Sequence, residues 1–144
     1  MKFICSIDIN KPILDVLTLF SNLENRSLWM EGYRKSVLIS GTHGQPGAKS
    51  ELEFLAGKRK VKMIETIKVN SLPDEFTCTY EASGVINTVK CMFTEITDTT
   101  TDFCTVQEFQ FKGRFRVVAF FMPRIFKKQA TKYLTGFKTF CESR

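Results

Sequence analysis

Six segments with the character of β-strands follow one another through the middle of the chain, separated only by short turn-forming sequences. They span about residues 34–40, 47–56, 58–70, 75–82, 85–96 and 102–112. Gly, Pro, Asn and Asp are frequent in separators such as SGTHGQPG and NSLPDE, as expected of turns. Connections this short join neighbouring antiparallel strands, because a parallel return needs a crossover of a dozen or more residues. The pattern therefore predicts an antiparallel sheet.

The first 28 residues predict one more strand and two short helices. KFICSIDIN alternates apolar and polar residues from position 2, with the period of a half-buried strand. Residues 13–20 then carry apolar side chains at helical spacing. SNLE has the form of a capping box, in which Ser21 and Glu24 begin a second short helix that reaches about residue 27 or 28. The sheet should thus have seven strands.

The chain ends on a predicted long helix. After the short segment RFRVVAFFM, apolar residues recur at three- and four-residue steps over roughly 20 residues, or about 30 Å of helix. The stripe consists of Ile125 or Phe126, Ala130, Tyr133 or Leu134, Phe137, and Phe140 or Cys141. A stripe of this length must be buried, and the inner face of the sheet is the only large apolar surface available. We expect one α+β domain over residues 1–144.

Three phrases, in this order, carry a resemblance to a known superfamily: INKPILDVLTLFSNLENRSLWMEG, QPGAKSELEF and FQFKGRFRVVAFFMPRIFKKQATKYLTGFKTFCE. The chain resembles START-like, Bet v 1-like (SRPBCC) proteins, in particular the bacterial polyketide cyclase/dehydrase and lipid transport branch. The resemblance implies the helix-grip fold, in which a curved seven-stranded antiparallel sheet wraps the C-terminal helix and leaves an apolar cavity. Members include lipid and sterol carriers, hormone binders and aromatic cyclases, so the fold leaves function open.

The inward faces of the predicted strands are rich in Phe, Met and Cys, which suits either a lined cavity or a solid core. Polar groups at inward positions, including Asn87, could orient the oxygen atoms of a ligand. The residues that we expect to bind a ligand are Trp29, Phe54, Met63, Glu65, Tyr80, Phe93, Gln107, Phe109, Phe126 and Tyr133.

Two of these candidates have an alternative interpretation. Glu65 lies between Met63 and Ile67, and a buried carboxylate is costly without a partner, so it is the candidate catalytic acid or base. Alternatively, a β-bulge turns Glu65 outward, or an inward Arg pairs with it. Trp29, the single tryptophan, either forms part of a cavity entrance with Met30 and Tyr33 or plugs that end of the core.

Other sequence signals argue against several classes of protein. The five cysteines are odd in number and form no C-x-x-C pair, which argues against both a zinc site and a disulfide framework. The single His43 lies in a Gly-rich turn, and we expect no metal and no cofactor. The absence of a long apolar run, and of a signal peptide at the start, predicts no transmembrane segment and a cytoplasmic location.

The net charge of +6 permits attraction to anionic partners. The basic residues concentrate in GKRKVK at 57–62 and in the final helix at Arg124, Lys127, Lys128, Lys132 and Lys138. They form either a solvated face or one that contacts anionic membrane or RNA weakly.

Three functions remain open at this point. The first is binding of a hydrophobic or amphipathic small molecule (lipid, quinone or polyketide-like) in a cavity between sheet and helix. The second is cyclase or dehydratase chemistry in that cavity with Glu65 as general acid/base. The third is an interaction module that uses the basic face. The sequence decides neither whether the protein is an enzyme nor its oligomeric state.

Overall fold

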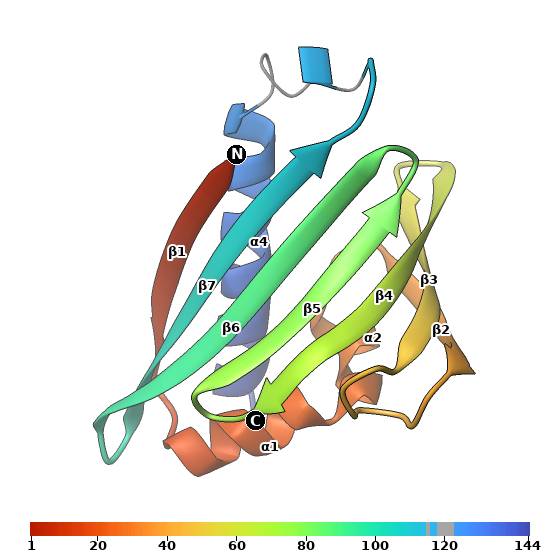
Figure 1. Ribbon diagram of the computed structural model, residues 1–144. Coiled ribbons are helices and arrows are strands. Elements are labelled where there is room, and N and C mark those ends of the chain that lie inside the picture. The colour runs from red at the N-terminus through yellow and green to blue at the C-terminus, as the bar shows by residue number, and fades with distance from the viewer. Residues whose placement is uncertain (115, 118–122) are drawn as a thin grey trace.

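A seven-stranded antiparallel sheet and one long helix form the body of the protein (Figure 1). The computed structural model describes residues 1–114, 116, 117 and 123–144. Its elements are β1 (Lys2–Ile9), α1 (Ile13–Ser21), the 3₁₀ helix η1 (Leu23–Asn25), α2 (Arg26–Trp29), β2 (Tyr33–Ser40), β3 (Lys49–Ala56), β4 (Arg59–Ser71), β5 (Glu75–Ala82), β6 (Val85–Thr97), β7 (Thr100–Phe111) and α4 (Pro123–Glu142). The strand order β1-β7-β6-β5-β4-β3-β2 confirms the predicted sheet. Most of the predicted segment RFRVVAFFM lies outside the described residues.

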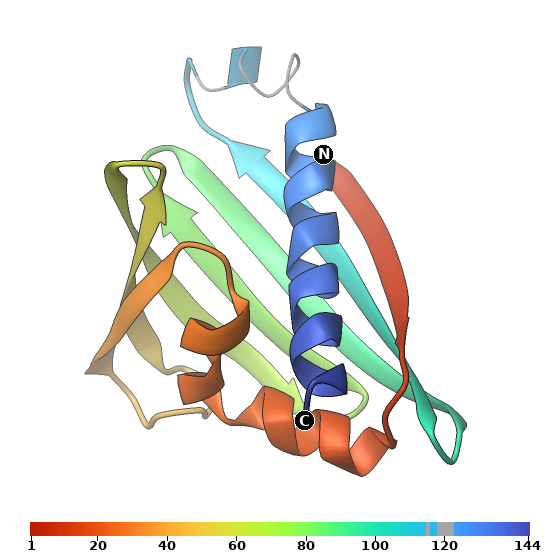
Figure 2. The ribbon, with the colours of Figure 1, turned by 180° about the vertical axis from the view of Figure 1, so that it is seen from behind.

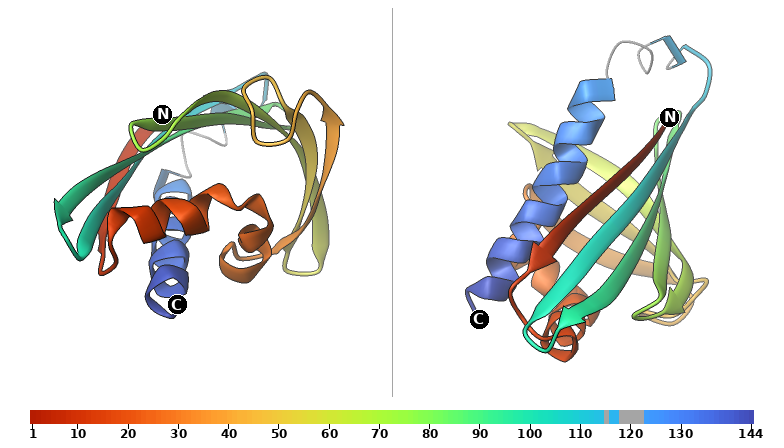
Figure 3. Two further views of the ribbon diagram at one scale, coloured as in Figure 1. Left: turned by 90° about the horizontal axis from the view of Figure 1, so that it is seen from below. Right: turned by 90° about the vertical axis from the view of Figure 1, so that its left-hand side faces the viewer.

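The sheet curves around α4, as Figure 2 shows from the side of the helix. Seen from below in Figure 3, the sheet arches over α4, and α1 lies across the lower end of the arch. This arrangement confirms the predicted fold class, with the short helices α1, η1 and α2 after the first strand and a long C-terminal helix against the concave face.

A solid aromatic core fills the half of this arch toward the β6–β7 turn. Phe93 and Phe103 face each other across that hairpin with their ring centroids 4.6 Å apart. Phe20 of α1 contacts the Phe93 ring edge-on at 4.9 Å, and Phe137 of α4 contacts Phe103 at 5.4 Å. Edge-to-face and offset pairs of this kind are favourable beyond their burial. In this half of the sheet, the inward Phe side chains therefore form a packed core, which is one of the two arrangements that the sequence left open.

The second short helix starts differently from its prediction. Ser21 completes the last turn of α1 and does not cap the next element. Asn22 is the cap instead, because its side-chain Oδ1 accepts a hydrogen bond from the Glu24 backbone N–H at 3.2 Å. The predicted SNLE capping box is therefore wrong by one residue, since Asn serves at an N-cap as well as Ser does.

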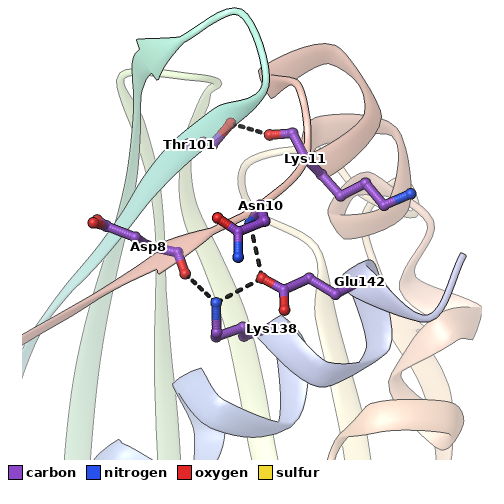
Figure 4. Close-up of polar contacts among 6 residues, drawn as sticks. All are labelled: Asp8, Asn10, Lys11, Thr101, Lys138 and Glu142. Carbon is purple, nitrogen blue, oxygen red and sulfur yellow. Dashed lines mark hydrogen bonds and ion pairs between the residues drawn. The ribbon is translucent and has the colours of Figure 1, made fainter.

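The C-terminal end of α4 is fixed to β1 by polar contacts (Figure 4). Lys138 Nζ donates to the backbone oxygen of Asp8 at 2.6 Å and pairs with Glu142 Oε2 at 2.6 Å. The same carboxylate oxygen accepts a hydrogen bond from the Asn10 backbone N–H at 2.8 Å. The hydrogen bonds from Asn10 and Lys138 hold the pKa of Glu142 below its usual value. These contacts set the lower end of the helix against the edge of the sheet.

Candidate functional site

A cavity of about 340 Å³ lies between the first half of α4 and the sheet, toward the β5–β6 turn. Strands β3 to β7 supply one wall, and α4 supplies the other through residues that include Phe126, Ala130 and Tyr133. Its volume falls at the small end of the range of about 300–1,000 Å³ for ligand cavities. On the concave side of the sheet, this cavity thus lies at the end opposite to the aromatic cluster of Phe93 and Phe103.

The structure brings seven of the ten sequence-predicted ligand-binding residues together around this cavity. They are Phe54, Met63, Tyr80, Gln107, Phe109, Phe126 and Tyr133. Trp29, Glu65 and Phe93 lie outside its lining. Sequence reasoning did not propose Gln129 and Lys132, which also line it, because these polar residues stand at the edge of the apolar stripe of α4.

Aromatic and branched side chains make up the apolar part of the wall. Phe126 of α4 packs against Phe109 of β7 with ring centroids 4.7 Å apart, and Phe109 stacks on Phe111 at 6.0 Å. Val85 and Val89 of β6 continue the surface. This wall offers flat faces to a ring-containing ligand.

Two amide side chains supply polarity on the same wall. Asn87 and Gln107 come from the paired strands β6 and β7, and Asn87 Nδ2 donates to Gln107 Oε1 at 3.3 Å. Among the described residues, nothing donates a hydrogen bond to the buried Oδ1 of Asn87. An amide carries two donor hydrogens and an oxygen that accepts twice, so the pair retains capacity for a ligand hydroxyl or carbonyl.

Two tyrosines contribute neutral hydroxyl groups to the lining. Burial raises the pKa of Tyr80 well above its ordinary value, and the nearby Glu65 carboxylate raises it further. Burial likewise raises the pKa of Tyr133, with Cys91 adding to the effect. Both phenols stay protonated at neutral pH, because desolvation disfavours their charged forms. Each hydroxyl can donate or accept a hydrogen bond.

Glu65 is buried and points inward, and its carboxylate forms an ion pair with Arg26. Arg26 Nη2 of α2 lies 2.8 Å from Glu65 Oε2, and the two side chains are 7% and 3% exposed. Burial alone would lower the pKa of Arg26, but Tyr80 and Glu65 outweigh it and raise the pKa above its ordinary value. The structure therefore confirms the alternative interpretation from the sequence, in which an inward Arg pairs with Glu65.

The Arg26–Glu65 pair faces a second, smaller cavity of about 180 Å³. Ser50 of β3 and the loop residue His43 line the same space. A role for Glu65 as the acid or base of the larger cavity therefore has no support from this geometry, because its carboxylate is ion-paired and absent from that lining.

Trp29 occupies the position of a plug. It is 9% exposed, and its ring meets Tyr133 at 4.9 Å and Phe137 at 5.0 Å, both edge-on. Its backbone approaches α4 closely, since a Cβ added at Gly136 would lie 2.6 Å from the Trp29 carbonyl oxygen. The ring closes the core beside the cavity, while its neighbour Met30 lines the cavity itself.

Two searches of the described residues address other kinds of site. No group of three or more His, Cys, Asp or Glu side chains in the described part of the chain could hold a metal ion. Within the same residues, no helix combines the length and the apolar character needed to cross a membrane.

Comparison with known proteins decides the fold. The Zhui aromatase/cyclase from Streptomyces sp. R1128 superposes with a TM-score of 0.83 at 7% identity, over 100% of this chain and 94% of that one. The chain shares the helix-grip fold of this aromatase/cyclase. Ara h 8.0201 superposes with a TM-score of 0.77 at 12% identity, over 100% and 99% of the two chains. The norcoclaurine synthase of Thalictrum flavum, solved with dopamine and hydroxybenzaldehyde, gives 0.74 at 12% identity over 97% and 85%.

Sequence comparison gives no further relative: no family model matches the chain, and no curated protein matches it. The identities to the solved structures are low, so these likenesses establish a shared fold and leave the ligand and the chemistry open.

Proposed function

We propose that the protein binds one compact hydrophobic or amphipathic small molecule in the cavity between α4 and the sheet. The observation that carries the proposal is the hollow itself, about 340 Å³ in volume and walled by aromatic side chains, beside the packed aromatic cluster of Phe93 and Phe103. An ordinary core closes such spaces, because an unfilled apolar cavity lowers stability.

The size and polarity of the cavity favour a molecule of a few linked or fused rings. Two acyl chains, each about 15 Å long in one leaflet of a bilayer, exceed this space. Asn87 and Gln107 would bind a hydroxyl or carbonyl group while Phe109 and Phe126 contact the ring faces. A quinone or a polyketide-like aromatic fits this description better than a two-chain lipid does.

The similar structures support this choice by analogy. One is named an aromatase/cyclase, and another was solved with dopamine and hydroxybenzaldehyde, two compact phenolic molecules. We propose a ligand of comparable size and chemistry for this chain. The five free cysteines fit a reducing compartment, which supports action in the cytoplasm.

Native mass spectrometry would test the proposal. We expect a 1:1 complex with small phenols or quinones such as 2-naphthol and menadione, and a weaker one with a diacyl phospholipid. Asn87→Leu/Gln107→Leu should lower affinity for 2-naphthol by about tenfold relative to naphthalene, since one or two hydrogen bonds are lost. Absence of any 1:1 complex across the panel would refute a binding cavity.

Cyclase or dehydratase chemistry in the same cavity is a second candidate function, but without Glu65 as its acid or base. Its acid or base would have to be a group other than Glu65, because Arg26 holds that carboxylate in an ion pair. If Glu65→Gln abolished turnover of a bound substrate without unfolding the protein, Glu65 would be catalytic and this restriction would be wrong.

A further inference from the structure

The charges of the chain are segregated along the sequence. Segments 57–62 and 109–132 together contain 11 of the 21 Lys and Arg residues and none of the 15 acidic residues. The rest of the chain holds ten basic and 15 acidic residues, so it is net negative. A solvated surface that serves solubility alone would mix both signs.

The fold places both basic segments at the same end. The β3–β4 turn, the β5–β6 turn and the end of β7 lie at the same end of the strands, and α4 begins there (Figures 1 and 2). Lys58 lies in the β3–β4 turn, and Lys127 and Lys128 lie in the first two turns of α4. All three side chains are exposed. We call this end, formed by residues 57–62, 112–114, 116, 117 and 123–128, the basic end.

The cavity lies at the basic end too. Phe54 comes shortly before the β3–β4 turn, Val85 follows the β5–β6 turn, and Phe126 is in the first turn of α4; all three line the cavity. Acidic side chains approach this end at its margins: Glu51 pairs with Lys62 at 3.6 Å, and Glu31 pairs with Lys132 at 3.7 Å. Glu53 lies opposite Lys62 in the sheet, and Glu81 lies beside the β5–β6 turn.

Apolar side chains stand exposed among these cations. Val117 is 63% exposed and Ile125 is 50% exposed. Ile125 is adjacent in sequence to Phe126, which lines the cavity, and precedes Lys128 by less than one helical turn. Exposed apolar groups interspersed with Lys and Arg are typical of segments that lie in a membrane interface, where the cations meet anionic headgroups.

We propose that the basic end docks on the surface of an anionic lipid membrane, so that the cavity opens toward the bilayer. The cations attract the headgroups, and Val117 and Ile125 enter the boundary of the acyl region. Docking would give an apolar molecule dissolved in the bilayer a short path into the cavity. The docking itself does not rest on the proposed ligand, because vesicles without any ligand should bind the protein.

Flotation with lipid vesicles tests the docking. We expect binding to vesicles of phosphatidylcholine with one quarter phosphatidylglycerol, little binding to phosphatidylcholine alone, and loss of binding as salt rises from 0.1 to 0.5 M. Each cation near such a surface contributes about fivefold, so Lys127→Ala/Lys128→Ala should weaken binding by roughly 30-fold. Lys49→Ala/Lys68→Ala, exposed and at the opposite end of β3 and β4, is the matched control and should have little effect.

The apolar contacts distinguish a membrane from another polyanion. Ile125→Ser should lower vesicle binding by about fivefold and leave binding to a single-stranded RNA oligomer unchanged. Equal binding to neutral and anionic vesicles, or equal losses in the two double variants, would overturn the proposal. An Ile125→Ser variant that binds vesicles normally, with RNA bound more tightly than vesicles, would assign the basic end to nucleic acid instead. Ligand binding is measured without vesicles, so its failure is separate from any of these results.

Discussion

Replacing Arg26 by Met should destabilise the protein far more than removal of an exposed cation would. The variant keeps the aliphatic bulk of the side chain but leaves the Glu65 carboxylate, 3% exposed, without the guanidinium that now lies 2.8 Å away. Two unit charges at that separation attract by about 6 kcal/mol at an effective dielectric constant of about 20. Part of that energy already offsets the desolvation of both groups, and breaking a buried pair costs about 3–5 kcal/mol in practice.

Denaturant or thermal unfolding measures this loss. A chain of 144 residues should unfold with an entropy that turns 3–5 kcal/mol into a fall of about 10–17 °C in Tm. Lys62→Met is the matched control, because the Lys62–Glu51 pair spans 3.6 Å with side chains 61% and 45% exposed. Exposed pairs contribute at most about 1 kcal/mol.

A second substitution tests the physical reason for the loss. Arg26→Met/Glu65→Leu removes the unpaired charge as well, so it should recover most of the stability that Arg26→Met loses. The reasoning is wrong if Arg26→Met costs no more than Lys62→Met. It is also wrong if the double variant is no more stable than Arg26→Met, since the cost would then come from packing and not from an isolated carboxylate.

Two further predictions concern packing and pH. Gly136→Ala should lower the free energy of unfolding by about 1–2 kcal/mol, because the new Cβ would meet the Trp29 carbonyl oxygen at 2.6 Å and overpacking outweighs the gain in helix propensity. Thr135→Ala on the exposed side of α4 is the control, and equal stability of the two variants in urea would contradict the close approach. Burial raises the pKa of Cys91 from 9.0 to about 12. The fold therefore holds this proton more tightly than the unfolded chain does, and Cys91 should make stability fall between pH 9 and 12 by up to about 1.4 kcal/mol per pH unit, in addition to the fall caused by Cys141 and Cys78, whose pKa values burial also raises. Cys91→Ala should reduce the slope by the share of one thiol; an unchanged slope would show that Cys91 does not contribute to it.

The fold could be predicted from the sequence because its signals are local. Alternation in KFICSIDIN, short Gly- and Pro-containing turns, and the apolar stripe from Phe126 to Cys141 each reflect a single element. Together they allow one arrangement, a sheet wrapped on a long helix. The capping error at Ser21 concerns one residue and left the element order intact.

The position of the cavity could be predicted only in part. Alternation shows which face of a strand is buried, but not how far along the strand a given side chain meets α1 or α4. Phe93 and Phe109 both face inward, yet Phe93 packs against Phe20 in the solid core while Phe109 lines the hollow. That difference depends on where α1 crosses the sheet. The position of this crossing cannot be predicted from the residue pattern of a single strand or helix.

The partner of Glu65 was unpredictable for a related reason. An inward carboxylate requires a cation, but nothing near it in sequence selects one of the 21 Lys and Arg residues. Arg26 lies in a short helix among polar neighbours, where an exposed position is the ordinary expectation. The two charges meet only because the tertiary fold places α2, which carries Arg26, beside the inward face of β4, which carries Glu65.

The central claim is that the space between α4 and the sheet binds a ligand, and a cavity-filling variant tests it most directly. Ala130 is buried on α4 and lines the cavity, so Ala130→Leu should place three further carbon atoms in it. Thr131→Leu adds apolar bulk to the exposed neighbouring position and serves as the control. Fluorescence titration with 2-naphthol should show one site in the parent and in Thr131→Leu, and affinity at least tenfold lower in Ala130→Leu. Equal affinity in all three proteins would place the ligand elsewhere and contradict the account.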